Sequence, residues 1–483
     1  MERLSNKTIG AVKAGVAVPG YDRSGVTPGI VHLGIGAFHR AHQAVVVDDL
    51  LGRDPSWGIV GASLRRPDTS AALTPQDGLY SMLVKDGDKR ALRVIGSVLE
   101  VIDAPQHKEA LLARMADPAT RIVSLTVTEK GYCYNAATGG LDVANPDIAA
   151  DLKQPRQPAS AAGIVVEALR RRREAGLAPF TVLSCDNLPH NGAVSARVFT
   201  EFAEAVDAGL GRWVRDNVAF PGTMIDRIVP ATTDADRAEV AALLGLEDAW
   251  PVMAEPFLQW VIEDKFVGGA RPAFELGGAE FTGDVAPYER MKLRMLNGSH
   301  SMMAYLGYLS GSEFIAQVVG QEPFQRFVSR AMADEIAPTL GMAKAGTDAY
   351  AGQLLERFSN SALRHRTYQI AMDGSQKLPQ RLLGTIADRI KAGLPFERLA
   401  LGVAAWMVYA SGVGLDGKPI VVQDPMAAEF AKIDPARTVE GYLAIERVFP
   451  RELAGNAVFR EAVGTKLGLL REIGAAEAVA RTA

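Results

Sequence analysis

The stretch GIVHLGIGAFHR, at residues 29–40, decides the fold of the first half of this 483-residue chain. A short apolar run ends in the glycine turn Gly34-Ile35-Gly36, and a helical stretch follows from about residue 40 to residue 51. Glycine permits a tight turn and lets a pyrophosphate approach the backbone, while the start of a helix offers N–H donors. Since His39 replaces the third glycine of the G-x-G-x-x-G pattern, an ordinary strand–turn–helix remains an alternative.

Patterns of buried strands and helices alternate beyond this turn. Further strands are expected at 58–64, 92–95, 121–127 and 180–185, and helices at 108–115 and 161–175. Such alternation predicts a parallel sheet covered by helices on both faces.

From Pro287 onward the pattern becomes helical, with helices expected at 290–310, 324–335, 350–358, 378–391, 396–409 and 458–472. A chain of this length exceeds what one hydrophobic core can organise. We therefore predict an α/β Rossmann-type N-terminal domain over 1–285 and a mainly α-helical C-terminal domain over 286–483.

The composition excludes several functional classes. A net charge of −4 gives no reason to expect nucleic acid or an acidic membrane surface as a partner. Only two cysteines, Cys133 and Cys185, exclude a disulfide framework and a cysteine-rich zinc site. The first residues lack the apolar segment of a secretory signal, and the apolar stretch 399–415 is shorter than the ~20 residues of a membrane span. We expect a cytoplasmic protein, a monomer or weak homo-oligomer, that acts on a small molecule.

An acidic residue after the second strand is expected to bind the adenosine ribose, and Asp68 is the candidate. It lies further from the glycines than the usual spacing of about 20 residues. A carboxylate there accepts hydrogen bonds from the ribose diol and repels a 2′-phosphate, which favours NAD. The neighbouring Arg65 and Arg66 could pair with that phosphate, so NADP remains the less favoured alternative.

The segment ERMKLRMLNGSH, at residues 289–300, carries the polar side chains that alcohol oxidation needs. On an α-helix, four of them fall within an arc of about 140°: Glu289, Lys292, Asn297 and His300. Hydride transfer from an alcohol without a metal needs a base and donors that stabilise the developing alkoxide. A lysine whose pKa burial lowers can be the base, and amides can be the donors. The alternative is a solvated helix face.

A second polar cluster, SCDNLPHN at residues 184–191, directly follows a buried strand. Polar residues at the carboxyl end of a parallel strand face the ligand crevice. Asn187 is therefore a candidate second donor to the substrate oxygen, while Asp186 could equally cap a helix.

Long segments of the chain resemble the polyol-specific long-chain dehydrogenases, the family of mannitol 2-dehydrogenase and fructuronate reductase. The segments are GIGAFHRAHQ (34–43), SLTVTEKGYC (124–133), SCDNLPHN (184–191), KLRMLNGSH (292–300), DRI (226–228), EPFLQWVIEDKFV (255–267) and DGSQKLP (373–379). The resemblance runs from about residue 28 to about residue 470. It implies a Rossmann-type domain, a mainly helical domain, and catalysis without zinc between them.

The resemblance also implies roles for individual residues. Lys292 would be the general base, Asn187 and Asn297 the oxyanion hole, His300 a substrate ligand and Glu289 the proton relay. Further implied substrate ligands are Asp226 and Lys377, with Arg366 available for a carboxylate. The implied cofactor residues are Gly34, Gly36, Phe38, His39, Arg40, Asp68 and Thr128.

Departures from the family pattern leave the substrate open. Gln369 stands where mannitol 2-dehydrogenase has a substrate-binding arginine, and residues 364–370 look more like fructuronate reductase. Residues 187–194 and 250–267 look more like mannitol 2-dehydrogenase, although Pro67 replaces that branch's glutamate before Asp68.

We predict an NAD-dependent polyol dehydrogenase that converts D-mannitol to D-fructose. The first alternative is reduction of a keto-uronate such as fructuronate, whose carboxylate needs a guanidinium such as Arg364 or Arg366. Oxidation of arabinitol or sorbitol is a further alternative. A catalytically silent nucleotide-binding regulator is a remote one, since a sensor does not need the base Lys292.

Overall fold

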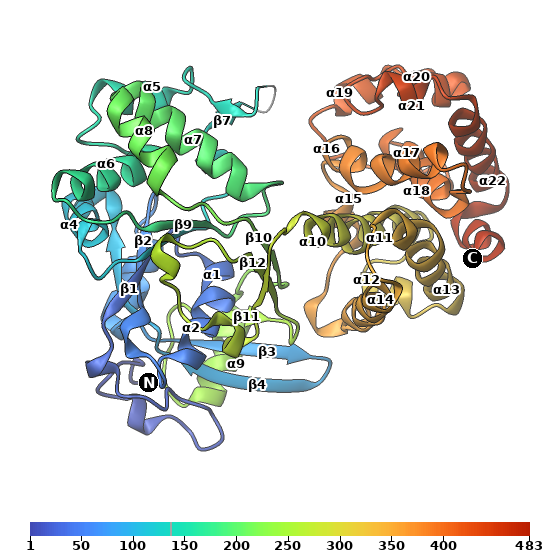
Figure 1. The fold of residues 1–483 in the computed structure, drawn as a ribbon. Coiled ribbons are helices and arrows are strands. Elements are labelled where there is room, and N and C mark those ends of the chain that lie inside the picture. Colours follow the sequence, from blue (N-terminus) through green and yellow to red (C-terminus); the bar gives the residue numbers. More distant parts are fainter. Residues whose placement is uncertain (136–137) are drawn as a thin grey trace. The chain divides into compact units, whose positions relative to one another are not determined.

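The computed structural model of the protein describes residues 1–135 and 138–483. The chain separates into two compact units, Met1–Ala286 and Pro287–Ala483, called unit 1 and unit 2 below (Figure 1).

Unit 1 is built on a parallel sheet of five strands. These are β1 (Pro28–Leu33), β2 (Gly58–Ser63), β5 (Val98–Asp103), β6 (Ile122–Leu125) and β9 (Thr181–Ser184), in the order β5-β2-β1-β6-β9. The strand order reverses between β1 and β6, and in open parallel sheets the ligand crevice lies beyond the carboxyl ends of the strands at that point. The Rossmann-type prediction is confirmed.

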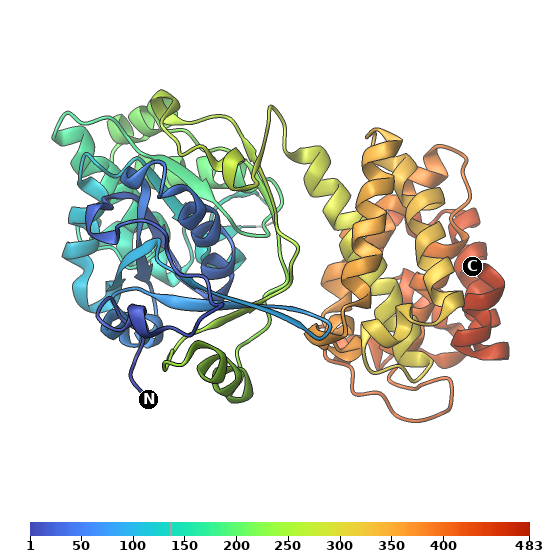
Figure 2. The ribbon, with the colours of Figure 1, turned by 90° about the horizontal axis from the view of Figure 1, so that it is seen from below.

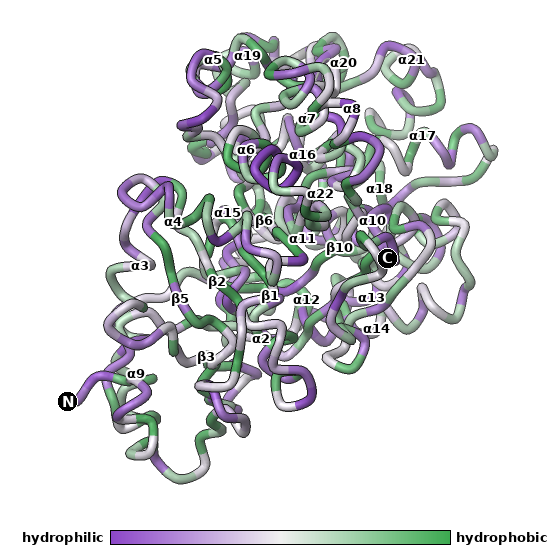
Figure 3. The backbone as a smooth tube through the Cα atoms, turned by 60° about the vertical axis from the view of Figure 1, so that its left-hand side comes forward, coloured by the Kyte–Doolittle hydropathy of each residue, from purple (hydrophilic) through white to green (hydrophobic). Residues whose placement is uncertain are grey.

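The inner strands β1 and β2 are buried along nearly their whole length, and most of their residues are apolar or glycine (Figure 3). Val31 and Leu33 belong to the core on one face, whereas Ile30 belongs to the core on the other. The sequence between the strands supplies the helices: α1 (Ala37–Ala41), α2 (Gln43–Leu50), α3 (Asp68–Leu73), α4 (Ala104–Ala116), α5 (Pro146–Lys153), α6 (Ala161–Glu174), α7 (Asn191–Val206), α8 (Ala208–Asn217) and α9 (Asp234–Leu244). Each fully buried Val or Ile side chain stabilises the fold by about 1.5–3 kcal/mol.

A two-stranded ribbon of β7 (Tyr134–Asn135) and β8 (Gly140–Leu141) and two three-stranded sheets complete the described part of unit 1. One has the order β11-β3-β4, from β3 (Tyr80–Asp86), β4 (Lys89–Ile95) and β11 (Val252–Ala254). The other has the order β10-β12-β13, from β10 (Thr223–Asp226), β12 (Gln259–Glu263) and β13 (Glu280–Thr282). The strand expected at 92–95 therefore belongs to an antiparallel hairpin and not to the parallel sheet. Asp86 pairs with Lys89, so the two-residue turn is Gly87-Asp88, with Gly87 at φ +53°, and such a turn is a hairpin signal.

Unit 2 consists largely of helices, as predicted; Figure 2 shows them in yellow-green to red. The larger ones are α11 (Ser299–Leu309), α13 (Glu322–Arg330), α14 (Lys344–Ser359), α17 (Gly384–Lys391), α18 (Glu397–Ala410) and α22 (Ala457–Thr482). Shorter ones include α10 (Ala286–Met291), α12 (Ile315–Val319), α15 (Thr367–Ala371) and α16 (Gly374–Leu378). Residues 399–410 of the apolar stretch at 399–415 belong to the buried helix α18, and Val413 beyond its end is exposed. Over the described ranges, every helix lacks the length or the apolar character needed to cross a bilayer.

Three of the expected helices contain π-helical turns, which the sequence did not reveal. These are η8 (Lys292–Gly298), η9 (Ala331–Ile336) and η12 (Pro379–Leu383). π-Helical segments are rare and occur frequently at functional sites. The first lies within the segment that carries the candidate catalytic residues.

Candidate active site

A cavity of about 530 Å³ opens at the carboxyl end of the parallel sheet in unit 1. Its lining includes Gly34 and Gly36 after β1, Arg65 and Arg66 after β2, and Thr128 after β6. This is the position at which a Rossmann-type sheet binds a dinucleotide, and the volume falls within the range of small-molecule sites.

The two glycines of the turn meet different demands. Gly34 has φ +91°, and a Cβ there would lie 2.2 Å from the carbonyl oxygen of Thr126, so only glycine fits. Gly36 caps the N-terminus of α1, and a Cβ there would meet only the carbonyl oxygen of Gly34, at 3.8 Å. The space beside Gly36 is therefore open within the cavity. This open backbone is the approach that a pyrophosphate requires, so the residues fit a dinucleotide.

Thr128 lines the same cavity in a strained conformation, with φ +65° and ψ 164°. Asp186 holds it there: its carboxylate accepts hydrogen bonds from the amides of Val127 and Thr128, at 3.0 and 2.8 Å, and from the Tyr132 hydroxyl at 2.8 Å. Burial raises the pKa of Asp186, and these donors oppose that shift. The alternative that Asp186 caps a helix is wrong, because His190 is the N-cap of α7. Asp186 is a positioning residue of the cavity.

The remaining α1 residues pack beneath the glycine turn. His39 is buried and stacks on His32 with ring centroids 3.4 Å apart. Arg40 is also buried, donates to the carbonyl oxygen of Trp250, and lies over the Tyr80 ring. Burial and then the neighbouring His32 hold the pKa of His39 well below its usual value.

Phe38, also on α1, is partly buried and stacks on His42 at 5.0 Å. Phe38, His39 and Arg40 are therefore engaged with the body of unit 1, and the turn glycines and Thr128 line the cavity.

Asp68 lies in the first turn of α3 and is exposed. Asp68 is not among the residues that line the cavity, whereas its chain neighbours Arg65, Arg66 and Thr69 are. The carboxylate and both guanidinium groups that bear on the choice between NAD and NADP therefore lie within four residues of one another along the chain.

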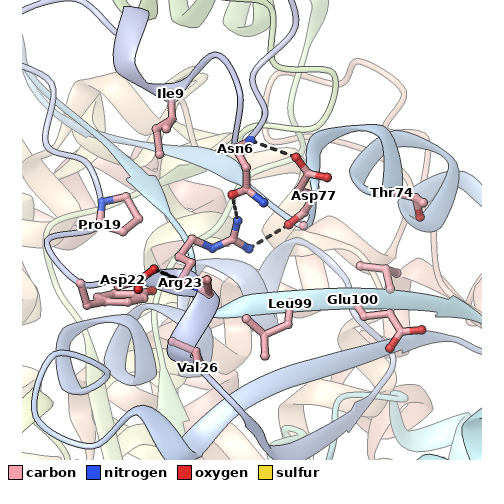
Figure 4. A pocket seen from close by; sticks show the side chains of 14 residues that line it. Asn6, Ile9, Pro19, Asp22, Arg23, Val26, Thr74, Asp77, Leu99 and Glu100 are labelled. Atoms are coloured by element: carbon pink, nitrogen blue, oxygen red, sulfur yellow. Dashed lines mark hydrogen bonds between the residues drawn. The ribbon is translucent and has the colours of Figure 1, made fainter.

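A second hollow of unit 1, of about 800 Å³, lies under the N-terminal segment (Figure 4). Arg23 is one of its lining residues. The guanidinium of Arg23 donates to the carbonyl oxygens of Gly96, Val98 and Asp77 and to the Asn6 side chain. These bonds attach the N-terminal segment to the sheet, so Arg23 has a structural role.

In unit 2, the π-helix η8 holds Lys292 and Asn297. Hydrogen bonds run from i to i+5 in a π-helix, so residues five apart lie one turn apart on one face, whereas an α-helix would separate them by about 140°. Gly298 ends η8 at a close contact, since a Cβ there would lie 2.8 Å from the carbonyl oxygen of Arg381 in η12. Lys292 and Asn297 are both partly buried, as is Glu289 on the preceding helix α10.

His300 follows in the first turn of α11. Its ring centroid lies 4.7 Å from Phe358 and 5.7 Å from His365, and its Nε2 lacks a hydrogen-bond partner among the described residues. Burial, and then His365, Arg381 and Arg357, hold its pKa well below the usual value. The imidazole is therefore neutral near pH 7, and its Nε2 can donate or accept one hydrogen bond with a ligand, depending on the tautomer.

Lys377 and Arg366 differ sharply in their surroundings. Lys377 lies on α16, and its ammonium donates to the carbonyl oxygens of Met372, at 2.6 Å, and Ile370, at 3.3 Å. Burial, and then Arg381, lower its pKa. The Arg366 side chain is 56 % exposed and pairs with Glu313 at 3.7 Å.

The other two expected substrate residues belong to unit 1. Asn187 follows β9 and is exposed, and Asp226 ends β10 and is buried. Across residues 1–135 and 138–483, His, Cys, Asp and Glu side chains form no group of three suited to hold a metal ion.

Both units match known protein families. Residues 28–276 match the mannitol dehydrogenase Rossmann domain, and residues 284–470 match the mannitol dehydrogenase C-terminal domain. D-mannonate oxidoreductase of Escherichia coli K12 is 49 % identical over 476 residues, which cover 96 % of this chain and 98 % of that protein. Mannitol 2-dehydrogenase of Pyrenophora tritici-repentis is 42 % identical and covers 97 % of this chain and 84 % of its own.

A solved structure also matches, that of Pseudomonas fluorescens mannitol 2-dehydrogenase in a ternary complex with NAD and D-mannitol. It is 38 % identical, covers 99 % of each chain, and has a TM-score of 0.84. The chain therefore belongs to the mannitol dehydrogenase family of polyol-specific long-chain dehydrogenases.

Proposed function

We propose that this oxidoreductase uses NAD to interconvert a secondary hydroxyl of an acyclic sugar derivative and the corresponding ketone. The observation that carries the proposal is the π-helix η8, in which an amine, Lys292, and an amide, Asn297, lie one turn apart on one face. A base and a donor to the same substrate oxygen are what metal-independent alcohol oxidation requires.

Each side chain then has a defined task. Lys292, as the neutral amine, takes the hydroxyl proton of the substrate, and Asn187 and Asn297 donate hydrogen bonds to the oxygen as it becomes a ketone. His300 orients the substrate with Asp226 and Lys377, and Glu289 passes the proton from Lys292 toward solvent. NAD, when bound, accepts the hydride. The turn glycines and Thr128 bind its pyrophosphate side, and the open backbone at Gly36 supports this.

The preferred cofactor is NAD, with NADP as the weaker alternative. The relative crystallised with NAD supports this, as does the carboxylate of Asp68, which lies along the chain between the cavity-lining residues Arg66 and Thr69. Arg65 and Arg66 line the cavity and are the groups that would admit a 2′-phosphate.

Two substrate pairs compete. The sequence motifs favour D-mannitol and D-fructose, whereas the 49 % identity to D-mannonate oxidoreductase favours D-mannonate and fructuronate. Gln369, in place of the substrate-binding arginine of mannitol 2-dehydrogenase, also favours the second pair. We therefore propose D-mannonate as the better substrate and D-mannitol as the second.

The test is to follow NADH absorbance with the purified full chain and a substrate panel. The panel comprises D-mannonate, D-mannitol, arabinitol and sorbitol for oxidation, and fructuronate, tagaturonate and fructose for reduction, each also measured with the NADP couple. Turnover of D-mannonate or D-mannitol is expected. NADH binding without turnover of any of them would instead favour the silent regulator.

A further inference from the structure

Arg381 is a largely buried guanidinium that lacks an acidic partner. It lies in the π-helix η12, and its Nη1 donates to the Ser301 hydroxyl at 3.1 Å. No carboxylate of the described residues forms an ion pair with it, and burial lowers its pKa. A charge removed from water without a partner destabilises the fold, so a buried guanidinium of this kind calls for an anion.

The surroundings of Arg381 are themselves positive. Lys377 lies four residues earlier on the same helical stretch, and burial followed by the charge of Arg381 lowers the pKa of Lys377. In addition to burial and to His365, the charges of Arg381 and Arg357 lower the pKa of His300.

Asp373 and Asp424 both raise the pKa of Lys377, but neither is among the groups that act on Arg381. Asp424 accepts hydrogen bonds from the amide and hydroxyl of Ser375 and from the amide of Met426. Asp373 lies at the N-cap of α16.

We propose that Arg381 binds the carboxylate of an acidic substrate, a six-carbon sugar acid, beside His300 and Lys377. The proposal rests on the function proposed above and names the residue that selects an acid over a neutral polyol. Arg381 is partly exposed, so a ligand can reach it, and a guanidinium binds a carboxylate through two parallel N–H···O bonds. Lys377 donates two of its three N–H groups to backbone carbonyls, which leaves the third for the same anion.

The arginines that the sequence suggested for this role are less suitable. Arg366 is exposed and already pairs with Glu313, and Arg364 is exposed over the Phe314 ring. Exposed charge pairs contribute little to binding because water screens them.

The experiment compares steady-state kinetics with D-mannonate and D-mannitol for the full-length protein and its Arg381→Gln and Arg381→Lys variants. Loss of a charged hydrogen-bonded pair should raise KM for D-mannonate by roughly 10- to 100-fold in Arg381→Gln. D-mannitol kinetics should change by about twofold or less, and Arg381→Lys should recover part of the loss. Arg326→Gln, an exposed arginine on α13 that pairs with Glu322, is the matched control and should change neither substrate.

A measurement on the wild-type protein tests the same proposal without relying on a variant that folds. D-mannonamide, the neutral analogue of D-mannonate, should show a similarly raised KM, because it removes the charge from the other partner.

Three results would overturn the proposal. One is an equal loss with both substrates in Arg381→Gln, which would indicate that Arg381 only holds η12 to α11 through Ser301. Another is a selective loss in Arg366→Gln but not in Arg381→Gln. The third is wild-type turnover of D-mannitol without D-mannonate, which leaves the proposed function intact. Absence of all turnover, with NADH bound, would defeat the proposed function itself.

Discussion

The cavity of unit 1 is shaped by backbone, whereas the candidate substrate residues of unit 2 are side chains on helices with π-helical turns. In unit 1, Gly34 turns the chain and Gly36 leaves its backbone open. In unit 2, the π-helix η8 carries Lys292 and Asn297, and the π-helix η12 carries Arg381. Gly298 allows η8 to approach the backbone of η12 closely. The difference agrees with the roles proposed above: the first region for a cofactor common to many enzymes, and the second for a particular substrate and reaction.

The largest expected effect separates chemistry from cofactor binding. Lys292→Ala should lower kcat by about 10²–10⁴-fold, the usual contribution of a general base, and leave the NADH dissociation constant unchanged. Single-turnover kinetics and NADH fluorescence titration measure the two quantities, and added small amines should restore part of the rate. Lys391→Ala, an exposed lysine at the end of α17, is the control. Wild-type turnover in Lys292→Ala would remove the assignment.

Alanine substitutions at the two turn glycines should have different effects, one on stability and the other on NADH binding. Gly34→Ala places a Cβ against the Thr126 carbonyl at a positive φ, so it should lower the free energy of unfolding by about 1–3 kcal/mol. Gly36→Ala has room within the protein, so it should keep the melting temperature and weaken NADH binding by about tenfold. Thermal unfolding and NADH titration of both variants test this. Equal NADH affinity in wild type and Gly36→Ala would contradict the placement of the pyrophosphate.

The same contrast between backbone and side chains explains which parts of the fold and of the candidate site could be predicted from the sequence. The glycine turn could be predicted because its backbone requirement is local to three residues. The π-helices could not, because Lys292–His300 also satisfies an α-helical pattern and the distortion accompanies the packing of Gly298 against Arg381. Asp186 was considered as a helix cap because its true partners, the amides of Val127 and Thr128, lie about 60 residues away along the chain.

The strand at 92–95 was assigned to the wrong sheet for a similar reason. Its length and apolar residues are typical of a strand, but pairing depends on the turn that precedes it. The two-residue Gly-Asp turn at residues 87–88 was the local clue to an antiparallel hairpin.

A smaller effect concerns the support beneath the glycine turn. Burial lowers the pKa of His32 to about 3, so this imidazole is neutral in the folded protein but titrates near 6.5 when unfolded. Between these pH values the unfolded state binds more protons than the folded state. The contribution of His32 to the free energy of unfolding is therefore fully present above pH 6.5 and is lost as the pH falls toward 3. This one group should remove about 2 kcal/mol between pH 7.5 and pH 5.

Urea unfolding at the two pH values measures this, with His32→Gln as the comparison. The variant should show a shallower loss than the wild type, whatever its stability at pH 7.5. Parallel losses in the two proteins would show that His32 is protonated in the fold.

The smallest effect tests the exposed Asp68, which lies along the chain next to residues that line the cavity of unit 1. Two charges in water interact by only about 1 kcal/mol, so Asp68→Asn should raise kcat/KM for NADPH relative to NADH by about fivefold. Because Asp68 is exposed, salt should screen its repulsion of a 2′-phosphate, and the gain should shrink at high ionic strength. Arg65→Gln and Arg66→Gln should change the ratio in the opposite direction, since they line the cavity beside it. If Asp68→Asn leaves the ratio unchanged at low salt, cofactor preference is set by the cavity lining rather than by the carboxylate that follows it.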